Sequence, residues 1–247
     1  MPDIVVITGG SRGIGAACAM LAAEAGYGVC LNYLSNSAAA DAVVSRIEAA
    51  GGTARAVAGD VGENDDVVAL FRQADEMGPL KGLINNAGIL DVRARVDEMT
   101  PGRLERIMRT NVLGCFFCAR EAVNRMSTKK GGTGGTIVNL SSVAALLGAP
   151  NQYVDYAASK GAIDTFTKGL ALEVAEEGIR VNGVRPGIID TEIHASGGEP
   201  ERAGKLRDII PMKREGSVKE VAEAILWLMS GKASYVTGAT LDVSGGR

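Results

Sequence analysis

The chain has 247 residues, of which 46% are hydrophobic, 22% are charged and 4% are aromatic, and it contains 33 glycines. Its 26 Lys and Arg against 29 Asp and Glu give a net charge of -3, which disfavours a dedicated nucleic-acid binder because such proteins concentrate positive charge on one face. The apolar content excludes a disordered chain and is sufficient to bury a substantial core.

Short apolar runs alternate with segments of helical periodicity along the whole chain. Strands are predicted at 4–8, 29–33, 54–58, 82–85, 136–140, 179–184 and 240–243. Helices are predicted at 13–25, 38–50, 64–77, 101–127, 153–177 and 217–230. This alternation predicts a single α/β domain over residues 1–247, a doubly wound parallel sheet with helices on both faces. Residues 188–216 have weaker periodicity and are typical of a flap over a substrate site.

The cysteines and the N-terminus carry no signal for export. Cys115 and Cys118 are spaced C-x-x-C, but no second ligand pair and no histidine lie nearby, so we expect buried thiols and no metal. The N-terminus lacks a signal-peptide pattern, and no apolar run reaches the ~18 residues that a membrane span needs. We therefore expect a cytoplasmic protein with neither a membrane nor a nucleic acid as partner.

The first predicted strand leads directly into a glycine-rich loop, TGGSRGIG at residues 8–15, and a helix follows. Gly9 permits a sharp turn, Gly13 lets the backbone approach a pyrophosphate, and Gly15 lets the helix pack closely on the strand. The helix N-terminus offers free N–H groups and a partial positive charge to phosphate. The loop predicts a Rossmann-type dinucleotide-binding sheet, and a tight turn that binds nothing is the alternative for this motif alone.

The spacing G-x-x-x-G-x-G, taken with motifs further along, resembles the classical short-chain dehydrogenase/reductase family. The other matching motifs, in family order, are Asp60-Val61, Asn85-Asn86-Ala87-Gly88, Asn111, Ser141-Ser142, Tyr156-Ala157-Ala158-Ser159-Lys160 and Pro186-Gly187. They extend the resemblance from Thr8 to the C-terminal 242–246. The resemblance implies a nicotinamide oxidoreductase that interconverts a carbonyl and an alcohol by hydride transfer.

The resemblance also implies which residues hold the cofactor. Asp60 and Val61 would hold the adenine, Asn86 to Gly88 would line the central groove, and Ile189 and Thr191 would contact the nicotinamide end. A helix cap at Asp60 and a strand-ending turn at 85–88 are the plain alternatives, and both can coexist with cofactor contact. The full candidate set is Gly9, Ser11, Arg12, Gly13, Ile14, Gly15, Asn32, Tyr33, Ser35, Asp60, Val61, Asn86, Ala87, Gly88, Tyr156, Lys160, Pro186, Gly187, Ile189 and Thr191.

The end of the second predicted strand bears on the choice of nucleotide. A site that prefers NAD usually places a carboxylate there for the ribose hydroxyls, whereas residues 31–35 read Leu-Asn-Tyr-Leu-Ser, without an acid. Arg12 lies in the phosphate loop, from which its guanidinium can reach a 2′-phosphate, and a solvated loop cation is the alternative. We therefore expect NADP(H) to be preferred over NAD(H).

Tyr156 and Lys160 lie four residues apart, which places both side chains on one face of a helix. A phenol with a pKa of about 10 is a poor acid or base at neutral pH, but a neighbouring ammonium and an oxidised nicotinamide favour the phenolate and lower this pKa. Tyr156 could then donate a proton to a carbonyl or accept one from an alcohol. The resemblance implies that Ser142 binds the same oxygen and that Asn111 holds a water linked to Lys160. An exposed helix pair is the alternative.

Several neighbouring residues need to be separated from this catalytic set. The interval from Ser142 to Tyr156 is one residue longer than in many family members, and we expect the loop at 148–155 to absorb it. Ser141 is an adjacent hydroxyl, but Ser142 matches the last position of the family pattern. Tyr153 lacks the four-residue spacing to Lys160, and His194, in the expected flap, suits a surface or substrate-lining role.

Two classes of function remain open from the residues. The first is an NADP-dependent reductase or dehydrogenase acting on a small ketone, aldehyde or 3-oxoacyl substrate. The second is a nucleotide-sensing or scaffold protein on the same fold that has lost catalysis. The resemblance further implies a homotetramer, with apolar helix faces in 101–127 and 153–177 at one interface and the C-terminal strand at another.

Overall fold

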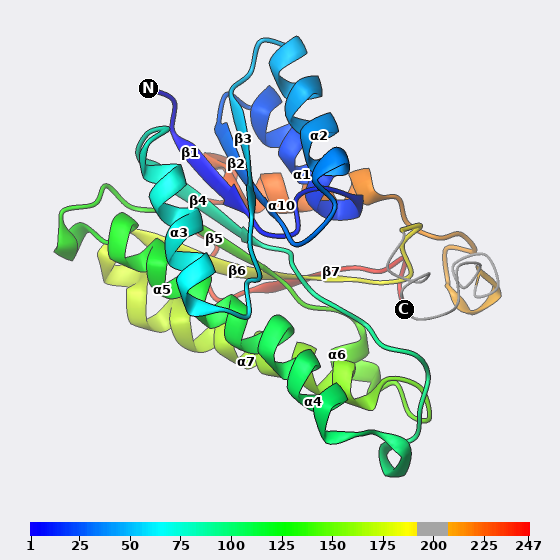
Figure 1. The fold of residues 1–247 in the computed structure, drawn as a ribbon. Coiled ribbons are helices and arrows are strands. Elements are labelled where there is room, and N and C mark those ends of the chain that lie inside the picture. The colour runs from blue at the N-terminus through cyan, green and yellow to red at the C-terminus, as the bar shows by residue number, and fades with distance from the viewer. Residues whose placement is uncertain (192–206) are drawn as a thin grey trace.

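The computed structural model describes residues 1–191 and 207–247, and the seven strands within them form one parallel sheet (Figure 1). The strand order is β3-β2-β1-β4-β5-β6-β7, which confirms the predicted doubly wound arrangement. The strands are β1 (Ile4–Ile7), β2 (Gly28–Tyr33), β3 (Ala54–Ala58), β4 (Leu80–Asn85), β5 (Gly135–Leu140), β6 (Ile179–Pro186) and β7 (Thr240–Val243).

Helices cover both faces of the sheet (Figure 1). One face carries α1 (Gly13–Glu24), α2 (Ser37–Ala49) and α10 (Val218–Met229), and the other carries α3 (Asn64–Asp75), α5 (Gly114–Met126) and α7 (Val154–Val174). Two shorter helices, α4 (Pro101–Met108) and α6 (Ala144–Leu147), pack against α7. Single 3-10 turns lie at Val96–Glu98, Thr128–Lys130, Ala175–Glu177, Arg207–Ile209 and Gly231–Ala233. Within the described ranges, no helix is long and apolar enough to cross a membrane.

Each helix layer closes its own hydrophobic core against the sheet. Cys18 of α1 lies fully buried in one core, and Cys118 of α5 lies fully buried in the other. All four cysteines are free and buried, which confirms the interpretation of the C-x-x-C pair as core thiols. Burial raises the pKa of the Cys115 thiol to about 12, so this thiol stays protonated and inert at neutral pH.

The predicted helix over 101–127 is interrupted. It is divided into α4 and α5 by a π-helical turn at Arg109–Leu113. The wider turn directs Asn111 inward, where its side chain is 2% exposed. Gly114 follows because a Cβ there would lie 2.9 Å from the Val61 side chain and 3.0 Å from its carbonyl oxygen. Periodicity alone does not reveal this insertion, because the apolar face continues through it.

The order in which the chain adds strands to the sheet reverses between β1 and β4. From β1 the chain winds outward to β2 and β3, and from β4 it winds the other way to β7. In such sheets a crevice opens at the carboxyl ends of the strands beside this switch point. The loops that follow β1, β4, β5 and β6 all leave the sheet at that edge, and they carry the predicted site residues.

The cap of α10 provides a test of the fold. Ser217 accepts a hydrogen bond from the Glu220 N–H, and Glu220 in turn accepts one from the Ser217 N–H at 2.8 Å. Ser217→Ala should therefore lower the free energy of unfolding by about 1 kcal/mol, measured by urea denaturation. Ser45→Ala, the same change at an exposed interior position of α2, is the control and should not destabilise the protein. Equal stability of the two variants would contradict this account of the cap.

Candidate active site

The glycine loop after β1 adopts a backbone conformation that favours glycine. Gly9 and Gly13 have φ values of +61° and +54°. A Cβ at Gly15 would lie 2.3 Å from the Gly9 carbonyl oxygen, so no side chain fits there. At Arg12, the N-cap of α1, no side chain caps the helix, and its first turn contains no acid. The loop thus leaves the positive end of α1 open, which fits a pyrophosphate.

Asn86 joins the loop to the end of β4. Its amide nitrogen donates hydrogen bonds to the carbonyl oxygens of Thr8 at 2.8 Å and Gly9 at 2.9 Å. The Thr8 hydroxyl accepts hydrogen bonds from the backbone N–H groups of Asn86 at 3.0 Å and Ala87 at 2.9 Å. Four hydrogen bonds therefore hold the ends of β1 and β4 together at the switch point.

At the end of β2, the side chain of the candidate residue Asn32 is held by internal hydrogen bonds. The Asn32 amide nitrogen donates to the Gly59 carbonyl oxygen at 2.8 Å, and its oxygen accepts from the Gly9 N–H at 3.4 Å. Tyr33 is half-buried and Ser35 is exposed beside them. Asn32 thus joins the phosphate loop to the end of β3.

Asp60 does not cap α3. Its carboxylate accepts a hydrogen bond from the Gly62 N–H at 2.8 Å, whereas the N-cap position of α3 is Glu63. The suggestion that Asp60 caps this helix is therefore wrong, because the chain turns once more before the helix begins. Val61, the next residue, is buried against Gly114.

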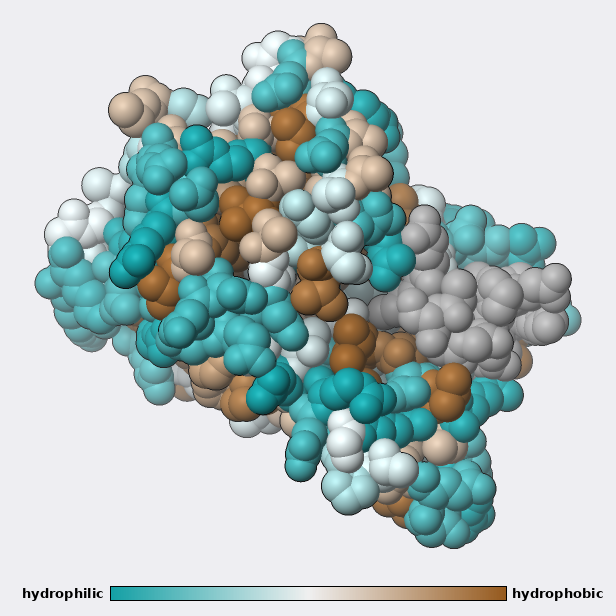
Figure 2. Space-filling view, in the orientation of Figure 1, coloured by the Kyte–Doolittle hydropathy of each residue, from teal (hydrophilic) through white to brown (hydrophobic). Residues whose placement is uncertain are grey.

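A cavity of about 360 Å³ opens at the carboxyl ends of β4, β5 and β6. Figure 2 shows hydrophobic side chains gathered between the part of the surface that carries α1 and α2 and the part that carries α4 and α6. The predicted site residues that line the cavity are Ile14, Asn86, Gly88, Ser142, Tyr156, Lys160, Pro186, Gly187, Ile189 and Thr191. Residues from distant parts of the sequence thus meet at one hollow.

Ser142 and Tyr156 form a hydrogen-bonded pair on the wall of this cavity. Burial raises the pKa of Tyr156 to about 12, and the hydrogen bond with Ser142 opposes that rise. The Ser142 hydroxyl also accepts a hydrogen bond from the Ala144 N–H at 3.1 Å, which orients it. The Ser141 hydroxyl instead donates to the Lys160 carbonyl oxygen at 3.1 Å, inside the protein. The geometry therefore favours Ser142 over Ser141 as the partner of Tyr156.

Lys160 lies behind Tyr156. Its ammonium donates to the Leu140 carbonyl oxygen at 2.7 Å and lies 5.6 Å from the centre of the Tyr156 ring. Burial lowers the pKa of Lys160 to about 8. The spacing of Tyr156 and Lys160 predicts that the ammonium, together with an oxidised nicotinamide, lowers the pKa of the phenol. In the protein alone, burial raises that pKa, and the hydrogen bond with Ser142 is what opposes the rise.

Asn111 holds the first residues after β4. Its amide oxygen accepts from the Ile89 N–H at 2.8 Å, and its nitrogen donates to the Ile89 carbonyl oxygen and to the Ser159 hydroxyl, both at 3.1 Å. A Cβ at Gly88 would lie 3.4 Å from the Lys160 nitrogen and 3.5 Å from the Asn111 oxygen. Lys160 and Asn111 thus both lie close to Gly88, on the side where a Cβ would project.

Sequence reasoning missed part of the cavity wall. Besides the predicted residues, the cavity is lined by Leu90, Leu140, Ser141, Val143, Ala144, Leu147, Ala149, Pro150, Gln152, Tyr153, Ile188 and Arg247. Tyr153, which lacks the four-residue spacing to Lys160, lines the same cavity as Tyr156. Its position directly before α7 is the sequence feature that could have identified Tyr153 as a cavity residue. His194 lies outside the described residues.

The loop between Ser142 and Tyr156 contains three residues with positive φ. Gly148, Ala149 and Asn151 all have positive φ, at 71°, 42° and 57°. Alanine rarely adopts this conformation, so the loop is held in place by its surroundings. That the loop at 148–155 absorbs an extra residue stays a prediction.

Comparison with known proteins agrees with the fold and the site. A family model described as "Enoyl-(Acyl carrier protein) reductase" matches residues 9–247. "Uncharacterized oxidoreductase YgfF" of Escherichia coli is 56% identical over 245 residues, or 99% of each chain. "3beta-hydroxysteroid dehydrogenase 1" of Eggerthella lenta is 42% identical, covering 98% of this chain and 92% of that protein. A blue fluorescent protein from a metagenomic library, solved in complex with NADPH, has a TM-score of 0.90 at 36% identity, covering 99% and 97% of the two chains.

These similarities extend over nearly the whole chain, and the sequence identities are well above those of proteins that share only a fold. The chain belongs to the short-chain dehydrogenase/reductase family, whose members are oxidoreductases that use nicotinamide cofactors. The resemblance noted from the sequence motifs is therefore confirmed.

Gly15→Ala tests the close approach in the phosphate loop. The added methyl group meets the Gly9 carbonyl oxygen, so we expect a loss of about 2 kcal/mol in the free energy of unfolding and weakened binding of NADPH. Gly102→Ala is the matched control, since a Cβ at that exposed position has no neighbour within 4 Å. Fluorescence titration with NADPH and urea denaturation give both quantities. Unchanged NADPH affinity in Gly15→Ala would exclude this loop as the pyrophosphate cradle.

Proposed function

We propose that the chain is an NADP(H)-dependent oxidoreductase that interconverts a carbonyl and an alcohol, with Tyr156 as general acid and base. The observation that carries the proposal is the hydrogen-bonded pair of Ser142 and Tyr156 on the cavity wall, with the buried Lys160 ammonium behind the phenol ring. A carbonyl oxygen that enters the cavity would meet two hydroxyl groups converging from β5 and α7. Residues 1–247 act in this proposal as one catalytic domain.

The division of labour among the residues follows from their positions. The bound nicotinamide would supply the hydride in reduction and accept it in oxidation. Ser142 would hold the substrate oxygen, and Tyr156 would donate its proton to that oxygen. The glycine loop and the open end of α1 would hold the pyrophosphate, and Asn86 and Gly88 would line the groove beyond it.

The protonation states of Tyr156 and Lys160 in the protein alone favour Tyr156 as a proton donor. With a pKa of about 12, Tyr156 retains its proton at neutral pH, while Lys160, with a pKa of about 8, is mostly charged. A protonated phenol is ready to reduce a carbonyl, because reduction requires a proton for the developing alkoxide. The Lys160 charge, close to the phenol ring, would stabilise the phenolate that proton transfer leaves behind.

The preference for NADP(H) is supported by the surroundings of the second strand. Neither Asn32 nor Tyr33 offers a carboxylate, and the Asn32 side chain is engaged by the Gly59 carbonyl oxygen. Arg12 is exposed in the phosphate loop, within the element that would hold the nucleotide. The solved metagenomic relative in complex with NADPH is consistent with this choice.

The cavity wall suggests the character of the substrate. Apart from the catalytic groups, the wall is mostly aliphatic, formed by Leu90, Leu140, Val143, Leu147, Ile188 and Ile189. Such a wall suits a ketone, aldehyde or 3-oxoacyl compound with an apolar body. The name of the Eggerthella lenta relative, a hydroxysteroid dehydrogenase, agrees with an apolar substrate. A silent nucleotide sensor is the second candidate, but the intact set of Ser142, Tyr156 and Lys160 favours the enzyme.

Assembly and location form the last part of the proposal. Phe116 of α5 stacks on Phe166 of α7 with ring centres 3.9 Å apart, and Phe116 remains exposed, as do Leu113 and Leu172 beside these helices. An apolar face of this kind suits pairing with a second copy, so we propose a homo-oligomer, most simply a tetramer. Four free thiols suit a reducing compartment, and we propose the cytoplasm.

Tyr156→Phe separates the enzyme from the sensor. The ring is kept and only the proton donor is lost, so kcat should fall about 10²–10⁴-fold while the Kd for NADPH changes little. Tyr153→Phe removes a hydroxyl from the other tyrosine of the cavity and should lower kcat by less than about tenfold. The measurements are steady-state kinetics over a panel of carbonyls and a fluorescence titration. Undiminished turnover in Tyr156→Phe would reject the proposed mechanism, and a parent protein that binds NADPH but reduces nothing would favour the sensor.

Arg12→Ala tests the choice of nucleotide. One or two charge-assisted contacts to a 2′-phosphate, each about 1.5–3 kcal/mol, should make NADPH bind more tightly than NADH in the parent protein. The variant should lose most of this difference and keep its affinity for NADH. Arg46→Ala, at an exposed position in the last turn of α2, should retain the full difference. An equal loss of affinity for both nucleotides in Arg12→Ala would count against the assignment.

A further inference from the structure

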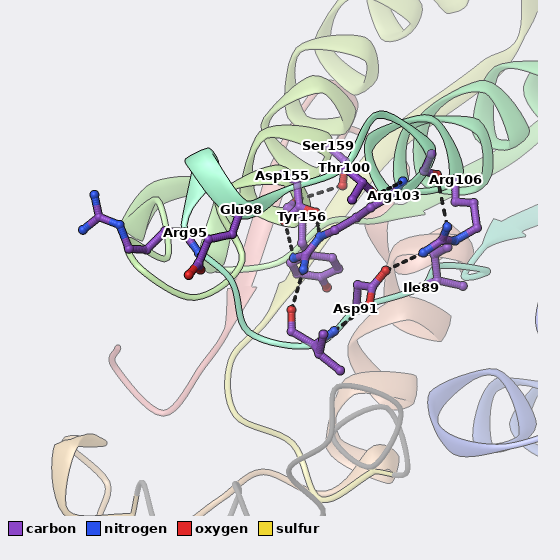
Figure 3. A network of polar contacts seen from close by, with 12 residues as sticks. Ile89, Asp91, Arg95, Glu98, Thr100, Arg103, Arg106, Asp155, Tyr156 and Ser159 are labelled. Carbon is purple, nitrogen blue, oxygen red and sulfur yellow. Dashed lines mark hydrogen bonds and ion pairs between the residues drawn. The ribbon is translucent and has the colours of Figure 1, made fainter.

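A buried ion pair lies next to Tyr156. Arg103 of α4 donates from Nε to one oxygen of Asp155 at 2.7 Å and from Nη2 to the other at 3.2 Å. The two side chains are only 7% and 1% exposed, and Asp155 directly precedes Tyr156 in α7 (Figure 3). The catalytic assignments above leave this pair without a role.

Local helix preferences do not explain the pair. Arg103 is in the first turn of α4, where its N–H is capped by Thr100 and where a positive side chain opposes the helix dipole. Burying two charges also carries a desolvation penalty that their attraction need not exceed. The position of Arg103 is therefore better explained by what its side chain holds than by any benefit to its own helix.

The guanidinium of Arg103 connects α7 to the loop that follows β4. Its Nη1 donates to the Val92 carbonyl oxygen at 2.6 Å, so one side chain contacts both the loop and the start of α7 (Figure 3). A second tie runs directly between these segments, from the Ala94 N–H to the Gln152 carbonyl oxygen at 3.1 Å. A third contact, the ion pair between Asp91 and Arg106 at 2.7 Å, connects the same loop to α4.

Both connected segments form walls of the catalytic cavity. The loop contributes Leu90, and the chain entering α7 contributes Gln152, Tyr153 and Tyr156. A change in the distance between the two segments would move the phenol relative to the substrate wall. Displacements of about 1 Å in such walls can cost about 10²-fold in rate.

We propose that Arg103 and Asp155 are positioning residues, which set the distance between the Leu90 wall and Tyr156 and thereby orient the substrate carbonyl toward the phenol. In its kinetic part the proposal rests on the proposed carbonyl–alcohol chemistry. The pair touches neither the reacting atoms nor the phosphate loop, so it should affect the carbonyl substrate and not the nucleotide.

The chain contains a second forked arginine–carboxylate pair away from the cavity, which is more exposed than the first. Arg125 of α5 donates from Nε and Nη2 to the two oxygens of Asp75 at 2.7 and 2.9 Å, and from Nη1 to the Glu121 carbonyl oxygen at 3.1 Å. This pair repeats the fork and the backbone contact of Arg103 between α3 and α5. It therefore serves as a control for the general effect of losing a bidentate ion pair.

The experiment compares Arg103→Lys and Asp155→Asn with Arg125→Lys and Asp75→Asn. For a carbonyl that the parent protein reduces, kcat/KM should fall about 10- to 100-fold in the first two variants and stay within about twofold in the controls. The Kd for NADPH should remain within about twofold of the parent value in all four, because the phosphate loop is not involved. Assays run below the thermal transition of each variant separate these effects from unfolding.

A second measurement does not depend on turnover. Arg93 and Arg95 are exposed in the connected loop, so trypsin cleavage after them reports how firmly the loop is held. Cleavage there should accelerate at least about fivefold in Arg103→Lys and Asp155→Asn and remain at the parent rate in the controls. Unchanged cleavage in both variants would overturn the proposed tether.

The remaining outcomes are also decisive. If kcat/KM of Arg103→Lys and Asp155→Asn stays within twofold of the controls, or if NADPH affinity falls in parallel with kcat/KM, the pair is structural and the proposal is wrong. A parent protein that reduces no carbonyl would reject the proposed function, and the cleavage rates would then decide alone whether the pair holds the loop.

Discussion

The site depends on one close approach of backbone to backbone, where the end of β1 meets the start of α1. The Gly9 carbonyl oxygen occupies the space that any side chain at position 15 would need, and Asn86 fixes that oxygen from the end of β4. Because β1 and β4 flank the switch point, this contact sets the edge at which the phosphate loop and the cavity meet. A bulkier residue here would separate the two halves of the nucleotide groove.

Burial shifts the pKa values of Tyr156 and Lys160, the two ionisable groups of the proposed mechanism, in opposite directions. It raises the pKa of Tyr156 and lowers that of Lys160, so in the protein alone both are shifted toward their neutral forms. The ammonium retains one short hydrogen bond, to the Leu140 carbonyl oxygen, and the negative charge of Asp164 acts on it from beyond ion-pair distance. A lysine left in this state can respond strongly to a phenolate forming beside it, because the low dielectric of its surroundings magnifies that charge.

The sequence was most informative where function depends on local spacing. The glycines of residues 8–15 and the four-residue interval between Tyr156 and Lys160 act within one turn or helix, so the fold class and the central residues could be predicted. Contacts between distant segments could not. Arg103 and Asp155 are 52 residues apart, and nothing local to either predicts the pair. The choice of Ser142 over Ser141 could be made from the family pattern, but the hydrogen bond that the Ser141 hydroxyl donates to the Lys160 carbonyl oxygen, 19 residues away, could not be predicted.

The start of α7 shows how a helix can hold a reactive group in place. Residues four apart share a face, so Asp155 and Ser159 point together toward α4 and the π-helical turn, where Arg103 and Asn111 bind them. Tyr156 and Lys160 share the next face and line the cavity. The first face is fixed by a buried ion pair at one turn and a buried amide at the next, so the helix can neither rotate nor slide without breaking both. The second face inherits that rigidity, so the position of the Tyr156 ring is set by contacts of its helix that do not involve the phenol hydroxyl.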